Sequence, residues 1–232
     1  MLFADSVPIV ALRRHYARFG EGTARAILTA NVGLSTGGVV LHVLGKVISI
    51  NVARPRTFDY FGNTVTTGIY KQPIGGRVMV RRFNIDGDEQ ADTRVLGGSQ
   101  VHGGELKAVY IYAADHYDHW RSELNRDLPH GQFGENLTVA GALEDVVRIG
   151  DTLRVGGALL AVTQPRTPCY KLDIKMEQPE FMKQFLASGR TGFYVRVLEE
   201  GEIGAGDEMS VIETDASRPT VLAVVRRQSA SG

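Results

Sequence analysis

Residues 47–83 read VISINVARPRTFDYFGNTVTTGIYKQPIGGRVMVRRF, and this stretch decides the fold class. Three short segments, 47–52, 63–70 and 77–83, are rich in Val, Ile, Thr and Phe and are separated by Pro and Gly. Such segments favour strands, and the Pro and Gly residues favour the turns between them. A parallel α/β sheet would require long helical patterns between the strands, and this stretch has none. It therefore predicts an antiparallel barrel or sandwich.

The same texture continues to residue 213, so we expect three parts. Residues 46–213 form the β domain, residues 1–45 form an N-terminal extension of unknown role, and residues 214–232 form a short tail with room for one helix. Helical spacing of apolar residues predicts two further helices, at 114–124 and 179–187. The fold expected is mainly β with a few short helices.

Composition excludes several classes of function. The 26 Lys and Arg residues balance the 26 Asp and Glu residues, so no overall field attracts a nucleic acid polymer or a membrane surface. No run of about 18 apolar residues is present to cross a membrane. A single cysteine cannot form an internal disulfide and is typical of a cytoplasmic protein. Exposed strand edges of a small barrel would suit a homodimer.

The cysteine lies in residues 163–172, which read TQPRTPCYKL. Two prolines make this a stiff, irregular exit from a strand, where Cys169 would face a cleft. Arg166 and Lys171 would favour the thiolate, which binds soft metals or attacks electrophiles. The alternative is a buried and inert thiol, because free cysteine is among the most buried residue types.

Other polar positions carry weaker signals. The paired glycines Gly103 and Gly104 would let backbone amides face an anion, although a tight turn without a ligand is the commoner explanation of such a pair. The neighbouring Glu135 and Asn136 would be either a turn device or site groups. Arg196, within an expected strand, would lie on the outer face or point into a cavity. The sequence Asp-Gly-Asp at 86–88 predicts a solvated turn.

Four motifs taken in order resemble the MOSC domain, the module found at the C-terminus of molybdenum cofactor sulfurases, and in particular its stand-alone YiiM-like group. They are VHGG at 101–104 followed by KAV, FGENL at 133–137, IGD at 149–151 and QPRTPC at 164–169. The resemblance covers about residues 46–213. Two departures stand out. The glycine pair is followed by Glu105 and Leu106 where the family usually has Pro-Asp, and the C-terminal region is shorter than in longer relatives.

The resemblance implies a largely antiparallel β-barrel and a molybdenum cofactor (molybdopterin). It implies that Cys169 holds the metal or carries sulfur, and that the protein reduces small N-hydroxylated compounds, such as hydroxylamino purines, with electrons from a separate donor protein. The alternatives are a sulfur carrier that uses a Cys169 persulfide, or a cofactor-binding module without turnover. The candidate cofactor-binding residues are Arg166, Lys171, His102, Gly103, Gly104, Lys107, Glu135, Asn136 and Arg196.

Overall fold

The computed structural model describes residues 42–91, 95–96, 99–100 and 103–230, so most of the predicted extension lies outside them. The strands are β1 (His42–Val52), β2 (Arg56–Tyr60), β3 (Asn63–Thr67), β4 (Gln72–Ile74), β5 (Arg77–Arg81), β6 (Asn84–Ile85), β7 (Val95–Leu96), β8 (Ser99–Gln100), β9 (Val109–Ala113), β10 (Leu137–Gly141), β11 (Thr152–Val155), β12 (Ala158–Pro165), β13 (Phe193–Glu199), β14 (Gly201–Gly204) and β15 (Glu208–Glu213). The helices are α2 (Tyr117–Leu124), α3 (Lys171–Met176), α4 (Phe181–Ser188) and α5 (Val221–Ala230), with 3-10 turns η1 (Glu105–Lys107) and η2 (Ala114–His116).

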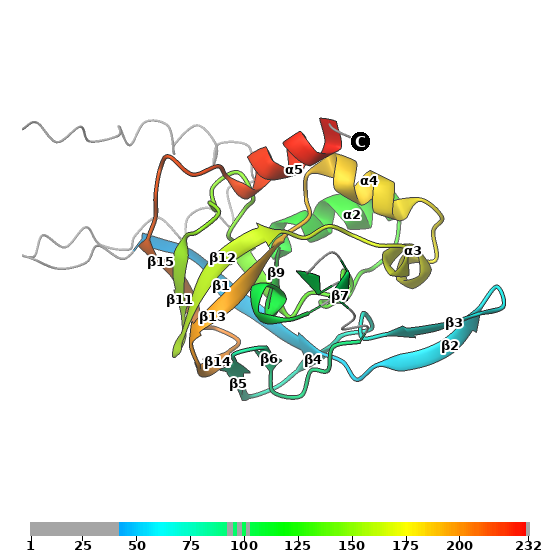
Figure 1. The fold of residues 1–232 in the computed structure, drawn as a ribbon, viewed down its shortest axis with the longest axis horizontal. Helices are drawn as coiled ribbons and strands as arrows, with labels where there is room; N and C mark the ends of the chain where they lie inside the picture. Colours follow the sequence, from blue (N-terminus) through cyan, green and yellow to red (C-terminus); the bar gives the residue numbers. More distant parts are fainter. Residues whose placement is uncertain (1–41, 92–94, 97–98, 101–102, 231–232) are drawn as a thin grey trace, which may run out of the picture. The chain divides into compact units, whose positions relative to one another are not determined.

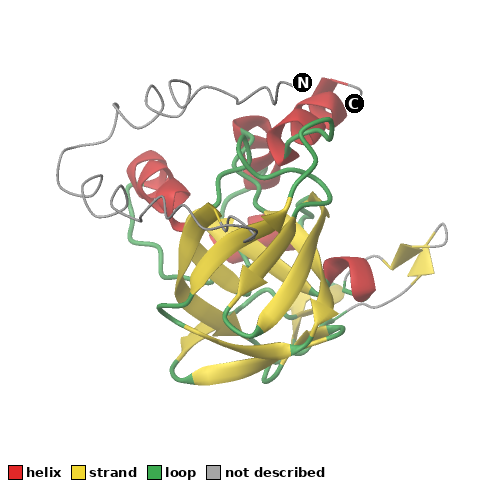
Figure 2. Ribbon diagram, turned by 90° about the vertical axis from the view of Figure 1, so that its left-hand side faces the viewer, coloured by secondary structure: helices red, strands yellow, loops and turns green. Residues whose placement is uncertain are grey.

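Seven strands close into a barrel, in the order β1, β10, β9, β13, β12, β11 and β15, with β15 pairing back to β1 (Figure 2). Among these ring pairs, β9 and β10 are parallel and the other pairs are antiparallel. The predicted largely antiparallel barrel is therefore confirmed. Strand β4 adds to the edge of β1 beyond the ring.

Strand β1 closes the ring because it pairs with β10, β15 and β4 along its length. Its register shifts between Val43 and Gly45 and again between Val47 and Ser49, which lets one strand bend from one neighbour to the next. Gly45 is required at this crossing, because a Cβ there would lie 2.2 Å from the carbonyl oxygen of Ala140. The barrel thus depends on one long, kinked strand.

The barrel interior is apolar because side chains alternate along each strand. In β11, for example, Leu153 and Val155 are buried while the residues before each of them are half-exposed. They pack with Leu160, Val195 and Met209 from neighbouring strands in one continuous cluster. Full burial of a side chain of this kind stabilises the fold by about 1.5–3 kcal/mol.

An aromatic cluster, distinct from the barrel core, joins β9 to α2, α3 and α4. The Trp120 and Phe185 rings stack with centroids 5.7 Å apart, and the indole N–H of Trp120 donates to the hydroxyl of Tyr112 at 2.8 Å. Figure 1 shows these helices together on one side of the strands. The cluster fixes α3 and α4 against β9, and so it positions the chain that follows β12.

The helices agree with the sequence patterns apart from their ends. The segment 114–124 begins as the 3-10 turn η2 and becomes α-helical at Tyr117, and the segment 179–187 forms α4 from Phe181. The tail contains the one helix expected, α5. The segment 63–70 ends as a strand at Thr67, where it has paired with β2 in a hairpin that extends away from the barrel (Figure 1). The tip residue Phe61 is 87% exposed.

Candidate functional site at the end of strand β12

The cysteine loop, residues 166–170, leaves the barrel where β12 ends. The amide of Arg166 donates to the carbonyl of Gly192 at 3.2 Å, so the loop starts anchored to the segment before β13. The carbonyl of Cys169 accepts from the amide of Leu172 at 2.8 Å, which starts the first turn of α3. Cys169 itself is a half-buried, free cysteine. The loop is therefore fixed at both ends while its thiol keeps access to solvent.

Arg166 is buried beside this thiol, with 6% of its surface exposed. Its guanidinium carbon lies 5.3 Å from the ring centroid of Tyr110 and 5.4 Å from that of Phe185. Burial lowers the pKa of Arg166, but Tyr110, Tyr194 and Cys169 raise it by more, so the side chain stays cationic. Its Nη1 atom has no hydrogen-bond partner among the described residues. A buried N–H without a partner costs about 1–3 kcal/mol, so a ligand that accepts from Nη1 would relieve that cost.

Lys171 and Lys175 both point into the protein from α3. They are four residues apart and so share one face of the helix. The Nζ atom of Lys175 donates to the carbonyl of Ile69 at 2.8 Å and to the carbonyl of Gly131. Burial lowers the pKa of Lys175 to about 7. Glu135 opposes this shift, and the positive charges of Lys71, Arg166 and Arg56 add to it.

Glu135 is fully buried and both of its oxygens accept hydrogen bonds from the protein. The amides of Gly131 (2.8 Å) and Phe133 (3.1 Å) donate to it, as do the hydroxyls of Thr138 (2.8 Å) and Tyr117. Burial first, and then the charge of Glu135, raise the pKa of Tyr117, so this hydroxyl remains a donor. Glu135 thereby holds the loop whose Gly131 carbonyl meets Lys175.

Asn136 connects this loop to an ion pair. Its amide nitrogen donates to Asp88 at 3.0 Å, and its oxygen accepts from the amide of Tyr110 at 3.1 Å. Asp88 also accepts from the amide of Ala53 at 2.8 Å and forms an ion pair with Lys71. Asp88 is only 8% exposed, so the prediction of a solvated turn at 86–88 is wrong for this residue. Asp88 is buried, and its carboxylate contacts both Lys71 and Asn136.

The glycine pair lies beside β12 through η1. Both Gly103 and Gly104 have positive φ, at 69° and 81°, and a Cβ on Gly103 would lie 1.7 Å from the side-chain oxygen of Gln90. The hydroxyl of Thr163 donates to the carbonyl of Leu106 at 2.6 Å, which ties η1 to the strand that delivers the cysteine loop. The positive φ thus favours glycine at both positions, and the Gln90 side chain would have to move to admit a Cβ at Gly103. His102 lies outside the described residues, and the cofactor role of the pair stays a prediction.

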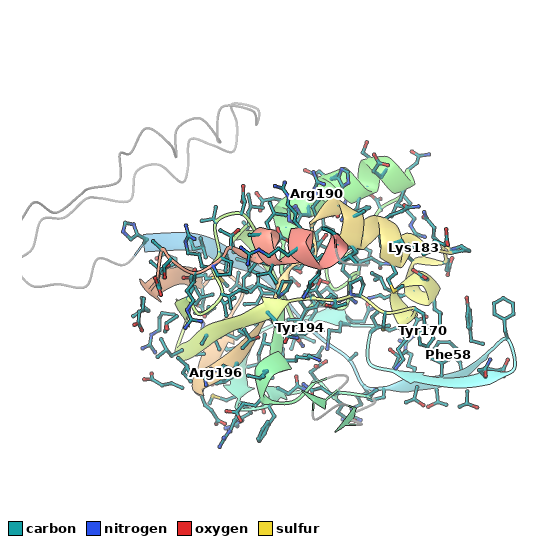
Figure 3. The ribbon with its side chains drawn as sticks, turned by 45° about the horizontal axis from the view of Figure 1, so that its top comes forward. Phe58, Tyr170, Lys183, Arg190, Tyr194 and Arg196 are labelled. Atoms are coloured by element: carbon teal, nitrogen blue, oxygen red, sulfur yellow. The ribbon has the colours of Figure 1, made fainter. Side chains whose placement is uncertain are left out.

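Two further candidates differ in their placement. Lys107 is half-buried at the end of η1, and burial lowers its pKa. Arg196 is exposed on β13, opposite Ala161 of β12. In Figure 3 it lies on the far side of the barrel from Tyr170, the neighbour of Cys169. The geometry places Arg166 beside Cys169, buries Lys171 at the start of α3 two residues after Cys169, and leaves Arg196 outside this group.

Sequence reasoning missed Lys71, Asp88 and Lys175, which are all buried here. Only Lys175 had a readable signal, because it stands four residues after Lys171 in a segment that also carries the apolar Leu172 and Met176. Two lysines on the apolar face of a short helix are unusual unless both ammonium groups find partners in the protein interior. Lys71 and Asp88 carry no such local signal.

The donor set fits a ligand that brings its own metal. Within the described ranges, no group of three or more His, Cys, Asp or Glu side chains is placed to hold a metal ion. What the protein offers at the loop is one thiol and one buried guanidinium with a free N–H. The thiol suits a soft metal that is held mainly by another molecule, and the guanidinium suits an anionic group on that molecule.

Among the described residues, no helix is long and apolar enough to cross a membrane.

The chain is similar in sequence and in fold to several known proteins. A family model described as the MOSC domain matches residues 98–210. The uncharacterized protein YflK of Bacillus subtilis (strain 168) is 44% identical over 167 residues, which are 72% of this chain and 73% of YflK. The crystal structure of YiiM from Geobacillus stearothermophilus has a TM-score of 0.66 at 32% identity and covers 81% of this chain and 85% of that chain.

A protein of Gibberella moniliformis named "Reductase" is also similar. It is 38% identical over 170 residues, which are 71% of this chain and 29% of that protein. The chain therefore spans less than a third of this relative. Its name describes the longer protein as a whole.

Proposed function

Because the chain belongs to the MOSC domain family, we propose that it is a molybdenum-cofactor-dependent reductase of N-hydroxylated compounds. The observation that carries the proposal is the unpartnered Nη1 of buried Arg166 beside the free thiol of Cys169. A protein tolerates a buried guanidinium N–H without a partner where a ligand supplies the acceptor. The relative named reductase supports a reductive activity for the shared region.

Three residues of this chain would hold the cofactor. Cys169 would bind the metal through its sulfur, since molybdenum is soft enough to prefer a thiolate. Arg166 would donate Nη1–H to the phosphate of the pterin, and Lys171, buried on the adjoining turn, would add a second positive charge. Pro165 precedes the loop and Pro168 lies within it, and both limit the reorganisation that ligand binding would require.

The reaction would convert R–NHOH, two electrons and two protons into R–NH2 and water. When bound, the cofactor would supply the two-electron exchange, with the electrons coming from a separate donor protein. The residues of this chain bind and orient. Arg166 remains cationic throughout because its neighbours hold its pKa above the ordinary value, so it fixes an anion and does not exchange protons.

Elemental analysis tests the cofactor site. Wild type and Cys169→Ala are purified from a host that makes the cofactor, and Thr167→Ala serves as the matched control because Thr167 is exposed in the same loop. We expect near-stoichiometric molybdenum in wild type and Thr167→Ala, and its loss in Cys169→Ala. Reduction of a hydroxylamino purine with a reduced viologen dye should fall at least about 100-fold in Cys169→Ala, or about 2.7 kcal/mol in activation free energy.

Two results would overturn the proposal. A Cys169→Ala protein that keeps both molybdenum and activity would remove Cys169 from the site. Absence of molybdenum from wild type, in a host that demonstrably makes the cofactor, would favour the sulfur carrier instead. In that case the Cys169 peptide should carry the mass of one additional sulfur atom, which a reductant removes.

A further inference from the structure

A buried pair of titratable side chains, His116 and Glu144, lies outside the candidate site. His116 ends η2 and is 9% exposed, and Glu144, in the turn after β10, is 4% exposed. The Nε2 atom of His116 donates to Oε2 of Glu144 at 2.7 Å, since a carboxylate can only accept. The ring of Tyr112 meets the His116 ring edge-on, with centroids 5.5 Å apart, and helps to hold it.

Stability alone does not explain why this pair is buried. A buried acid must leave water, and apolar residues of similar volume often stabilise a fold as well or better. An apolar residue cannot, however, accept a hydrogen bond from the backbone. The second oxygen of Glu144, Oε1, does so, because the amide of Gly192 donates to it at 2.7 Å. The pair therefore acts on the segment that precedes β13.

The peptide unit between Thr191 and Gly192 is held at both of its polar groups. Its N–H donates to Glu144, and its carbonyl accepts from the hydroxyl of Tyr110 at 2.7 Å. Gly192 has a φ of 65°, and a Cβ there would lie 2.3 Å from the carbonyl oxygen of Ile111. Glycine gives the backbone more conformational freedom than other residues do. The two hydrogen bonds, which we call the peptide clamp, therefore fix an orientation that the local chain would not fix by itself.

The cysteine loop is anchored to the next polar group along the chain. The carbonyl of Gly192 accepts from the amide of Arg166 at 3.2 Å, at the first residue of the loop. Tyr110 supports both parts, because its hydroxyl donates to Thr191 while its ring centroid lies 5.3 Å from the guanidinium carbon of Arg166. Loss of the peptide clamp would free the segment that carries the Gly192 carbonyl, and with it the start of the loop.

We infer that Glu144 and His116 are positioning residues for Cys169. Glu144 holds the 191–192 peptide from the side opposite Tyr110, His116 orients the Glu144 carboxylate, and the clamped segment fixes the start of the cysteine loop. The inference deepens the proposed function, on which its last step rests. That step is that a loop fixed in advance needs less ordering when the cofactor binds. The role requires no contact of either side chain with a ligand.

Amide hydrogen exchange, on full-length protein from a host unable to make the cofactor, tests the peptide clamp. The reporter is the amide of Arg166, whose acceptor is the Gly192 carbonyl. Glu144→Leu should accelerate its exchange at least about tenfold, or about 1.4 kcal/mol, because leucine accepts no hydrogen bond. Glu144→Gln should stay within about twofold of wild type, because its amide oxygen still accepts from Gly192 and its amide nitrogen can donate to His116. Wild-type exchange in Glu144→Leu would overturn the inference.

Asp151→Leu is the matched control. Asp151 is another buried acid, 3% exposed, that accepts from the amide of Arg148 at 2.8 Å and from the hydroxyl of Thr214. Its loss should lower global stability, yet the exchange of Arg166 relative to the slowest strand amides should stay within about twofold of wild type. An equal relative acceleration in Asp151→Leu would show that Glu144→Leu acts only through global stability, and would overturn the positioning role.

His116→Phe tests whether His116 acts through Glu144. Alone it should accelerate the Arg166 amide about threefold, because the carboxylate loses one donor. Combined with Glu144→Leu it should add nothing, and additive effects would remove His116 from the role. Tyr110→Phe keeps the ring and removes the hydroxyl, so it should accelerate exchange several-fold and serves if Glu144→Leu does not fold. A Tyr110→Phe protein with wild-type exchange at Arg166 would refute the peptide clamp.

Protein from a host that makes the cofactor separates this inference from the proposed function. Glu144→Leu should reduce a hydroxylamino purine at least about tenfold more slowly than wild type, and Glu144→Gln should restore most of the rate. Faster exchange at Arg166 in Glu144→Leu, with no molybdenum in wild type, would keep the positioning role and remove the proposed function. Unchanged exchange in a Glu144→Leu protein that carries molybdenum and is fully active would do the reverse.

Discussion

Two regions of the protein are buried, but they are stable for opposite reasons. One is the apolar barrel interior, and the other is the group of Lys71, Asp88, Glu135 and Lys175, which we call the charged end. Leu153, Leu160 and Val195 are inside because apolar surface leaves water at no cost to any polar group. Lys71, Asp88 and Glu135 are inside because each finds a partner that compensates for lost hydration. The first region tolerates other apolar side chains of similar size, whereas the second depends on particular pairs. The difference is one reason why we propose the ligand site near the second region and not in the first.

Among the substitutions that compare the two regions, Asp88→Asn should lower the unfolding free energy most. The substitution leaves Lys71 as a buried charge without a counter-charge, and removal of one partner of a buried pair costs about 3–5 kcal/mol. Urea unfolding measures the loss. The matched control is Asp86→Asn on the same turn, whose exposed pair with Arg81 should contribute less than about 1 kcal/mol. Equal costs for the two variants would show that the Lys71–Asp88 pair is not specially required.

In the barrel interior, Leu160→Ala should cost about 2–5 kcal/mol of unfolding free energy through a lost contact surface and a cavity. Leu198→Ala on β13 is the control, since Leu198 is exposed and should change stability by less than about 0.5 kcal/mol. Because Leu160 offers no ligand group, Leu160→Ala should retain the wild-type molybdenum content when it is purified folded from a host that makes the cofactor. A selective loss of molybdenum from the folded variant would contradict the division between the two regions.

The charged end should also make stability depend on pH. Lys175 has a folded-state pKa of about 7, below the unfolded value of about 10.4, so between these values the unfolded chain binds more protons on this side chain. The unfolding free energy should therefore rise with pH from 7.5 to 9, by at most about 1.4 kcal/mol per unit from this group. Lys175→Met should reduce the slope, and a smaller slope should remain because burial also lowers the pKa of Lys71.

Urea unfolding at several pH values measures this slope, with Lys183→Met as the control that should leave it unchanged. An identical slope in wild type and Lys175→Met would contradict the assignment of the titration to Lys175. The apolar interior contributes nothing to such a slope, because it contains no group that titrates.

The smallest effect is expected at the hairpin tip, which belongs to neither region. Phe61→Ser should change the unfolding free energy by less than about 0.5 kcal/mol, because the ring is almost fully exposed. Val65→Ser in the same hairpin is the contrasting variant and should cost more, since Val65 is buried opposite Phe58. Thermal unfolding compares them. A larger loss for Phe61→Ser would show that its ring is covered in solution.

The two regions also differ in how far the sequence predicts them. Enrichment in Val, Ile, Thr and Phe, with Gly or Pro between the segments, predicted an antiparallel barrel or sandwich, because these signals act within a few residues. The resemblance to the MOSC domain then favoured the barrel. The cysteine loop stood out because its chemistry is local to ten residues. The charged end has no local pattern: Lys71 finds Asp88 after 17 residues, and Lys175 meets the carbonyl of Ile69 at a separation of 106. From the sequence alone, Asp88 has the pattern of a solvated turn residue, and only the tertiary structure shows that it is buried.

The position of β1 has a consequence for the order in which the protein can fold during its synthesis. This strand is made before its ring neighbours, yet its partners are β10 and finally β15, where His42 pairs with Val211. The ring therefore stays open until nearly the whole domain has left the ribosome, and its first strand must wait with unpaired backbone groups. In a nascent chain, this strand would therefore expose unpaired N–H and C=O groups for longer than the ring strands made after it.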